Sequence, residues 1–76
     1  ELEINLDDAL EKVNNALKLL IPSEPSYPNI LDTKAEVLWK MKKNEQAVLI
    51  IEQAISLNPE SKYYKAQKEK FINSNN

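Results

Sequence analysis

The amino-acid sequence predicts an all-α fold of about four helices, built from antiparallel helix-turn-helix pairs. Apolar residues recur at alternating spacings of three and four over residues 2–20, which is the pattern of a helix that buries one face. Residues 44–59 form a nearly continuous apolar stretch that ends at a proline, a residue that cannot continue a helix. Three of the four prolines lie in residues 21–28, which indicates a connector between two helices.

Length and composition indicate one small, soluble domain. The chain has 76 residues, of which 42% are hydrophobic and 29% charged, and this is ordinary for a globular protein. The net charge of -2 argues against a nucleic-acid-binding protein, since such proteins carry a basic excess. No run of large apolar residues exceeds the four of residues 48–51, so we expect neither a membrane span nor a signal peptide. These features leave the compartment open and slightly favour the cytoplasm.

Three missing residue types exclude most site chemistry. The sequence contains no cysteine, no histidine and no glycine. Disulfides, thiolate metal sites and nucleophiles activated by histidine are therefore excluded, as are the glycine-dependent loops that bind phosphate or calcium. No pair of carboxylates has an apolar setting that would suit acid-base catalysis. We therefore expect a non-enzymatic protein with no catalytic residue, no metal site and no cofactor.

The first predicted helix spans residues 2–20. Asn5 is suited to capping its first turn, and Asp7 and Asp8 are placed where carboxylates favour the helix dipole. The apolar stripe of this helix consists of Leu2, Leu6, Leu10, Val13, Leu17 and Leu20. Ala9 and Ala16 lie on the same face, so this helix is expected to bury one side only.

Three further helices are predicted after the connector. The second runs from about residue 29 to 42, the third begins near Asn44 and ends before Pro59, and the fourth covers residues 60–73. In the turn between the second and third, Lys43 or Asn44 is expected to adopt a left-handed conformation, and Asn44 is also suited to cap the third helix. The expected anchors of the fourth helix are Tyr64, Phe71 and Ile72.

The first and third helices resemble each other in sequence. When residues 7–20 are aligned with residues 45–58, Ala9 meets Ala47, Val13 meets Ile51, Ala16 meets Ala54 and Leu19 meets Leu57. The two copies are 38 residues apart, which is within the range of helical solenoid repeats. Small residues at repeated positions on one face predict that another helix approaches closely there.

Residues 28–61 resemble one complete unit of the tetratricopeptide repeat family. The residues that match its signature are Leu31, Ala35 and Leu38 in the first helix, Ala47, Ile51 and Ala54 in the second, and the closing Pro59. The chain departs from the family at Lys34, at Lys42, where the turn usually has glycine, and at Asn44. Residues 1–21 are similar to the second helix of a preceding unit, and residues 60–73 to a capping helix. The resemblance implies a fragment of a right-handed superhelix.

The resemblance also implies a protein-protein interaction module. In this family the first helices line a groove that binds a peptide or a helix of a partner protein. The positions that would face this groove are Asn29, Asp32, Thr33, Glu36 and Lys40, with Trp39 at its edge. Asp32 and Glu36 would make its floor acidic and would favour a basic segment of the partner. The alternatives are that these residues form an ordinary solvated face and that Trp39 packs between helices.

Two other functions are compatible with the sequence. A first helix without a preceding partner is suited to self-association into a homodimer. The chain is also compatible with a C-terminal piece of a longer protein, such as an enzyme, whose activity lies upstream. The sequence does not identify the partner.

Overall fold

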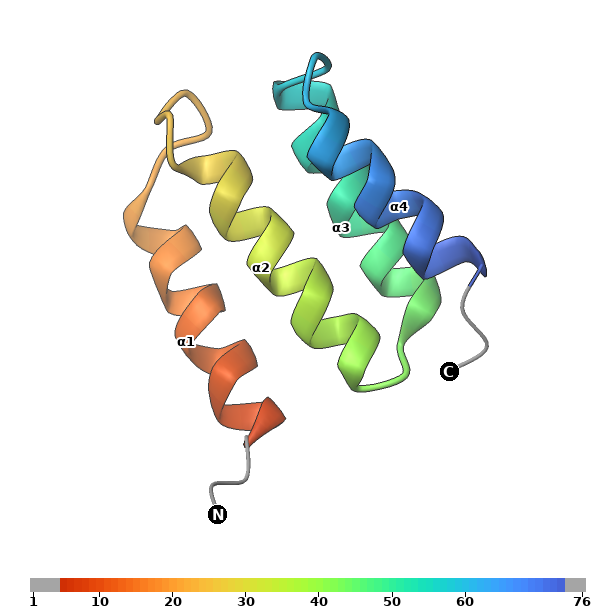
Figure 1. The fold of residues 1–76 in the computed structure, drawn as a ribbon. Helices are drawn as coiled ribbons and strands as arrows, with labels where there is room; N and C mark the ends of the chain where they lie inside the picture. Colours follow the sequence, from red (N-terminus) through yellow and green to blue (C-terminus); the bar gives the residue numbers. More distant parts are fainter. Residues whose placement is uncertain (1–4, 74–76) are drawn as a thin grey trace.

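The structure, a computed structural model, describes residues 5–73 and contains four α-helices. They are α1 (Leu6–Leu19), α2 (Tyr27–Lys40), α3 (Asn44–Leu57) and α4 (Lys62–Asn73). Each helix packs antiparallel against the next, and α2 and α4 run side by side in the same direction (Figure 1). No strand occurs in residues 5–73, so the predicted all-α class is confirmed. The expectations for Leu2 and for residues 74–76 lie outside the described residues.

Side chains cap two of the helices. The side chain of Asn5 accepts a hydrogen bond of 3.1 Å from the backbone N–H of Asp8, which confirms the predicted cap of α1. The hydroxyl of Ser61 accepts a hydrogen bond of 3.1 Å from the backbone N–H of Tyr64 at the start of α4. This second cap explains why α4 begins at Lys62, two residues later than predicted.

The second helix begins earlier than the sequence predicted. It starts at Tyr27 rather than near residue 29, with Pro28 in its first turn. Proline is well suited to this position because the first N–H groups of a helix have no partner within the helix and its fixed φ is already helical. The prolines of the connector therefore delay α2 less than expected.

The turn between α2 and α3 differs from the expectation for Lys43 and Asn44. Lys42 is the residue with a left-handed backbone, at φ 67°, while Lys43 has φ -101°. The N–H groups of Lys42 and Lys43 donate hydrogen bonds of 2.9 Å to the carbonyls of Trp39 and Leu38, respectively. This is the pattern of a Schellman cap, which normally has glycine where Lys42 stands. Asn44 is the first residue of α3 and Lys43 stands at the cap position, while the amide of Asn44 donates to the carbonyl of Phe71 at 3.4 Å.

The hydrophobic core lies between α2, α3 and α4. Its buried members are Leu31, Ala35, Leu38, Ala47, Ile51, Ala54, Tyr64 and Phe71. Ala35, Ala47 and Ala54 have no exposed surface, so the helices approach closely at these small residues. The burial predicted for the repeated alanine positions of the third helix is thus confirmed.

The first helix covers one side of α2 and buries no residue completely. Leu10 and Leu17 pack against the edge of the core and are half-buried. Leu19, at the C-terminal end of α1, is 87% exposed, and Ile21 in the connector is 59% exposed. α1 is therefore an outer helix that packs mainly against α2.

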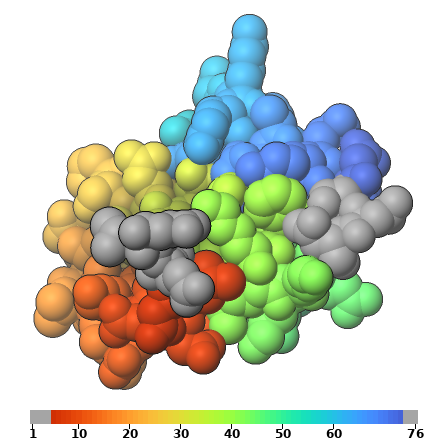
Figure 2. All heavy atoms as spheres, turned by 60° about the horizontal axis from the view of Figure 1, so that its bottom comes forward, coloured from red at the N-terminus to blue at the C-terminus, as the bar shows by residue number. Residues whose placement is uncertain are grey.

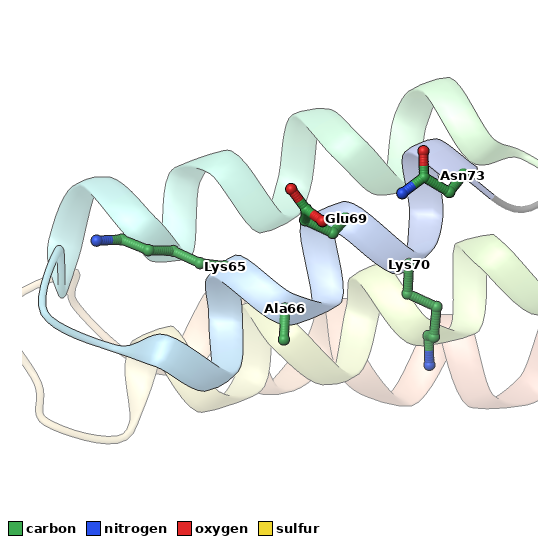
Figure 3. A pocket seen from close by; sticks show the side chains of 5 residues that line it. All are labelled: Lys65, Ala66, Glu69, Lys70 and Asn73. Carbon is green, nitrogen blue, oxygen red and sulfur yellow. The ribbon is translucent and has the colours of Figure 1, made fainter.

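The fourth helix has one buried side and one polar side. Tyr64 and Phe71 are buried, as predicted, but Ile72 is 57% exposed and is not an anchor. Glu69 and Asn73 point to the opposite side of α4 from Lys70, which extends toward α2 (Figure 3). Lys65 and Glu69 are exposed, so the outer side of α4 is hydrophilic. No helix within residues 5–73 is long and apolar enough to cross a membrane.

Candidate partner-binding site

A pocket of about 410 Å³ opens where α1, α2 and α4 meet. In the space-filling view, atoms of α2 lie between those of α1 and those of α4 (Figure 2). α2 contributes Asp32, Thr33, Glu36, Val37 and Lys40 to the lining, α1 contributes Leu6 and Ala9, and α4 contributes Tyr63, Gln67 and Lys70. We call this the α1–α2–α4 pocket. Its wall is apolar on the side of α1 and polar on the side of α4.

A row of hydrogen bonds, which we call the α2–α4 junction, joins α2 to α4, and its bonds from Gln67 and Lys70 lie in the polar wall of the pocket. The Tyr64 hydroxyl donates to the side-chain oxygen of Asn29. Gln67 Nε2 donates to Asp32 at 3.1 Å and to Glu36 at 3.0 Å. Lys70 Nζ donates to both carboxylate oxygens of Glu36, at 3.1 and 3.4 Å. Charge-assisted bonds of this kind hold α2 and α4 in register.

The two carboxyl groups of the junction have opposite pKa shifts. Burial raises the pKa of Asp32, and the hydrogen bond from Gln67 offsets this only in part. Burial also acts to raise the pKa of Glu36, but hydrogen bonds from Gln67 and Lys70 outweigh it and lower that pKa. Burial, with a smaller effect from the charge of Asp32, raises the pKa of Tyr64. Glu36 thus binds side chains of α4 strongly enough to outweigh its burial, whereas the hydrogen bond to Asp32 does not outweigh the burial of that carboxylate.

The charge of the pocket is more balanced than the sequence indicated. Asp32 and Glu36 were expected to make an acidic floor, but Lys40 and Lys70 line the same pocket. Lys70 bonds to Glu36, whereas Lys40 is exposed and forms no ion pair with the described residues. The pocket therefore presents Asp32 as an acceptor and Lys40 as a cation.

Trp39 lies beside the C-terminal half of α4 rather than in the pocket lining. Its ring packs against Phe71 with centroids 5.8 Å apart, and Lys70 Nζ lies 4.4 Å from its centroid. The ring is half-buried, and its Nε1 is buried without an acceptor among residues 5–73. In this position Trp39 supports the contact between α2 and α4.

Four of the six residues predicted to contact a partner line the same pocket. These are Asp32, Thr33, Glu36 and Lys40. Asn29 lies outside the lining and bonds to Tyr64, and Thr33 donates its hydroxyl to the backbone carbonyl of Asn29 at 3.1 Å. The sequence analysis missed Gln67, which is only 7% exposed and joins two carboxylates. The local sequence around Gln67, which is rich in lysine, gives no sign that this glutamine is buried.

Comparison with family models, curated proteins and solved structures gave no match to this chain. Residues 5–73 form an all-α arrangement of four sequentially antiparallel helices with a pocket that three of them line.

Proposed function

We propose that this chain is a non-enzymatic protein-protein interaction module similar to tetratricopeptide repeats. Residues 28–61 would form one complete unit, and residues 1–21 and 60–73 would flank it. The observation that carries the proposal is the α1–α2–α4 pocket, to which α2 contributes four residues that the resemblance assigns to a binding groove. The helix-turn-helix order and the buried Ala35, Ala47 and Ala54 also support it.

A segment of the partner with a basic side chain suits Asp32 best. Asp32 is half-buried and has no ion-pair partner among the described residues, while Glu36 is already bonded to Lys70 and Gln67. A basic side chain that reached Asp32 would be partly removed from water, which strengthens a charge-assisted hydrogen bond. We therefore assign Asp32 the main role in recognition and Glu36 a supporting role in the fold.

Selection from a library of random 12-residue peptides against the immobilised chain tests this function. We expect the selected peptides to share a lysine or an arginine. Asp32→Asn should weaken their binding about tenfold, because a hydrogen bond to a charged group is lost. The asparagine keeps an oxygen that can accept from Gln67, so the fold should be retained.

Asp7→Asn is the matched control, since it removes the same charge from an exposed position on α1. It should leave peptide affinity unchanged. Equal affinity of the selected peptides for the parent chain and Asp32→Asn would contradict the assigned role of Asp32. A library without any enriched peptide would contradict the proposed function itself.

Self-association through α1 is the alternative function. The observation that favours it is that α1 has no fully buried residue, although Leu6, Leu10, Val13 and Leu17 repeat along one of its faces. A second copy that covered this face would bury apolar surface.

A further inference from the structure

One edge of α1 is less covered than the matching edge of α3. Residues aligned between the two helices differ in burial: Ala47, Ile51 and Ala54 have no exposed surface, whereas Ala9, Val13 and Ala16 are half-buried. The physical reason is that α3 packs against both α2 and α4, while α1 packs mainly against α2. The uncovered edge of α1 has the same order of small and large side chains as the edge of α3, which two helices cover.

The relation between α2 and α4 indicates what would close this edge. α4 lies beside α2 in the same direction, and the α2–α4 junction joins them. A further helix that lay beside α2 as α4 does, but on the opposite side of α2, would contact both α1 and α2. Leu6 and Ala9 of α1 and Val37 of α2 line the α1–α2–α4 pocket on that side. An apolar stripe on the incoming helix would pack against these three residues.

The exposed charge on that side of α2 is that of Lys40, which also acts on Glu36 four residues earlier in the same helix. Lys40 is exposed and forms no ion pair with the described residues, in contrast to Lys70, which bonds to Glu36 at 3.1 Å. Thr33, two turns earlier on α2, donates its hydroxyl to the backbone carbonyl of Asn29 and carries no charge. A carboxylate on the incoming helix is the complementary partner for Lys40.

We propose that an amphipathic α-helix of a partner protein packs along α1 and α2, parallel to α2, with its apolar stripe on Leu6, Ala9, Val13 and Val37 and a carboxylate against Lys40. This inference rests on the proposed function and deepens it, because it assigns the partner a secondary structure and one charge. The alanines of α1 allow the close approach that Ala47 and Ala54 allow in α3.

The test uses two synthetic 18-residue amphipathic helices that differ only at one position on the polar edge, where one peptide has glutamate and the other lysine. Their affinity for the full chain is measured by fluorescence anisotropy. The glutamate peptide should bind about two- to fivefold more tightly, which is the range of a partly exposed ion pair. Lys40→Glu should reverse this preference, and Lys65→Glu, a matched change on the outer side of α4, should leave it unchanged.

A second pair of variants locates the helix on α1. Ala16→Lys places a long charged side chain on the uncovered edge and should abolish binding of both peptides. Asn15→Lys adds the same charge to the neighbouring, exposed position and should preserve binding. Circular dichroism establishes that both variants keep their helices, so that lost binding is not lost folding.

The inference would be overturned by equal affinity of both peptides, by equal loss in Ala16→Lys and Asn15→Lys, or by a stable dimer of the chain that already covers the edge. If basic peptides from the library bind through Asp32 while neither helix binds, the proposed function stands and this inference fails. If no peptide of any kind binds, both fail.

Discussion

At the scale of single residues, Lys42 stands where the backbone favours glycine. Its φ of 67° places the Cβ atom close to the following carbonyl, a strain of about 1–2 kcal/mol for a residue other than glycine. The Schellman hydrogen bonds of Lys42 and Lys43 require this conformation, because they close the end of α2 before α3 begins. The backbone of Lys42 is therefore locally unfavourable, and the packing of α2 against α3 offsets this cost.

Lys42→Gly should stabilise the protein. Glycine adopts a positive φ without the steric cost, although it also increases the entropy of the unfolded chain, so we expect a net gain of about 1 kcal/mol. For a domain of this size, that gain raises Tm by roughly 4–8 °C. Thermal unfolding followed by circular dichroism measures it.

Lys43→Gly provides the control for this prediction. It removes the same charge from the neighbouring position, but the φ of Lys43 is -101° and gives glycine no advantage. We expect no gain or a small loss of stability. Equal stabilisation by both variants would mean that the charge, rather than the backbone of Lys42, is responsible.

At the scale of helices, the α2–α4 junction links stability to pH in two opposite ways. Burial raises the pKa of Asp32 above its ordinary 3.8, which means that the charged carboxylate is less stable in the folded protein than in the unfolded chain. Ionisation of Asp32 therefore reduces folding stability as pH rises through this raised pKa. Hydrogen bonds to Gln67 and Lys70 outweigh burial and lower the pKa of Glu36 below its ordinary 4.5. Glu36 therefore contributes stability above pH 4.5, and this contribution is lost as pH falls through its lowered value.

Asp32→Asn and Glu36→Gln should consequently shift stability in opposite directions at pH 7. The change in the free energy of unfolding caused by Asp32→Asn should be more favourable at pH 7 than at pH 2.5. The change caused by Glu36→Gln should be less favourable at pH 7 than at pH 2.5. Urea unfolding at both pH values measures the differences, and Glu60→Gln in an exposed turn supplies the baseline. Two variants with the same sign of change would show that the junction does not govern this pH dependence.

At the scale of the whole molecule, the apolar surface is divided between separate places. Leu19 and Ile21 are exposed at the end of α1, whereas Leu49 on α3 and Ile72 on α4 line a different hollow of about 460 Å³. The uncovered edge of α1 consists of the half-buried side chains of Ala9, Val13 and Ala16. No single described face combines these residues into the broad apolar patch that a stable dimer needs.

We therefore expect the chain to be a monomer of 8.7 kDa at all accessible concentrations. Light scattering over a concentration series measures the molar mass. A dimer that dissociates on dilution would contradict this expectation and favour self-association. In that case Leu6→Lys or Leu10→Lys should yield monomer, while Leu49→Lys, on the other side of the molecule, should not.

Helix positions were largely predictable because they depend on local periodicity and on a few terminating residues. Asn5 caps α1 and α3 ends before Pro59, as expected, whereas the start predicted at residue 2 lies outside the described residues. The errors fall at places where local rules compete. Pro28 was interpreted as part of a connector but belongs to the first turn of α2, and Lys42 takes a conformation that sequence assigned to its neighbours.

The candidate site was predictable only in part. The sequence alone determined the class of fold and the small residues that become the core, since these follow from helical spacing. The four residues of α2 that line the pocket were expected from the resemblance to tetratricopeptide repeats. Tertiary structure decided which charges remain available. Gln67 and Lys70 come from a helix more than thirty residues away, and by bonding to Glu36 they leave Asp32 and Lys40 as the groups open to a partner. Such pairing depends on how α4 lies against α2, and no local pattern in either helix specifies it.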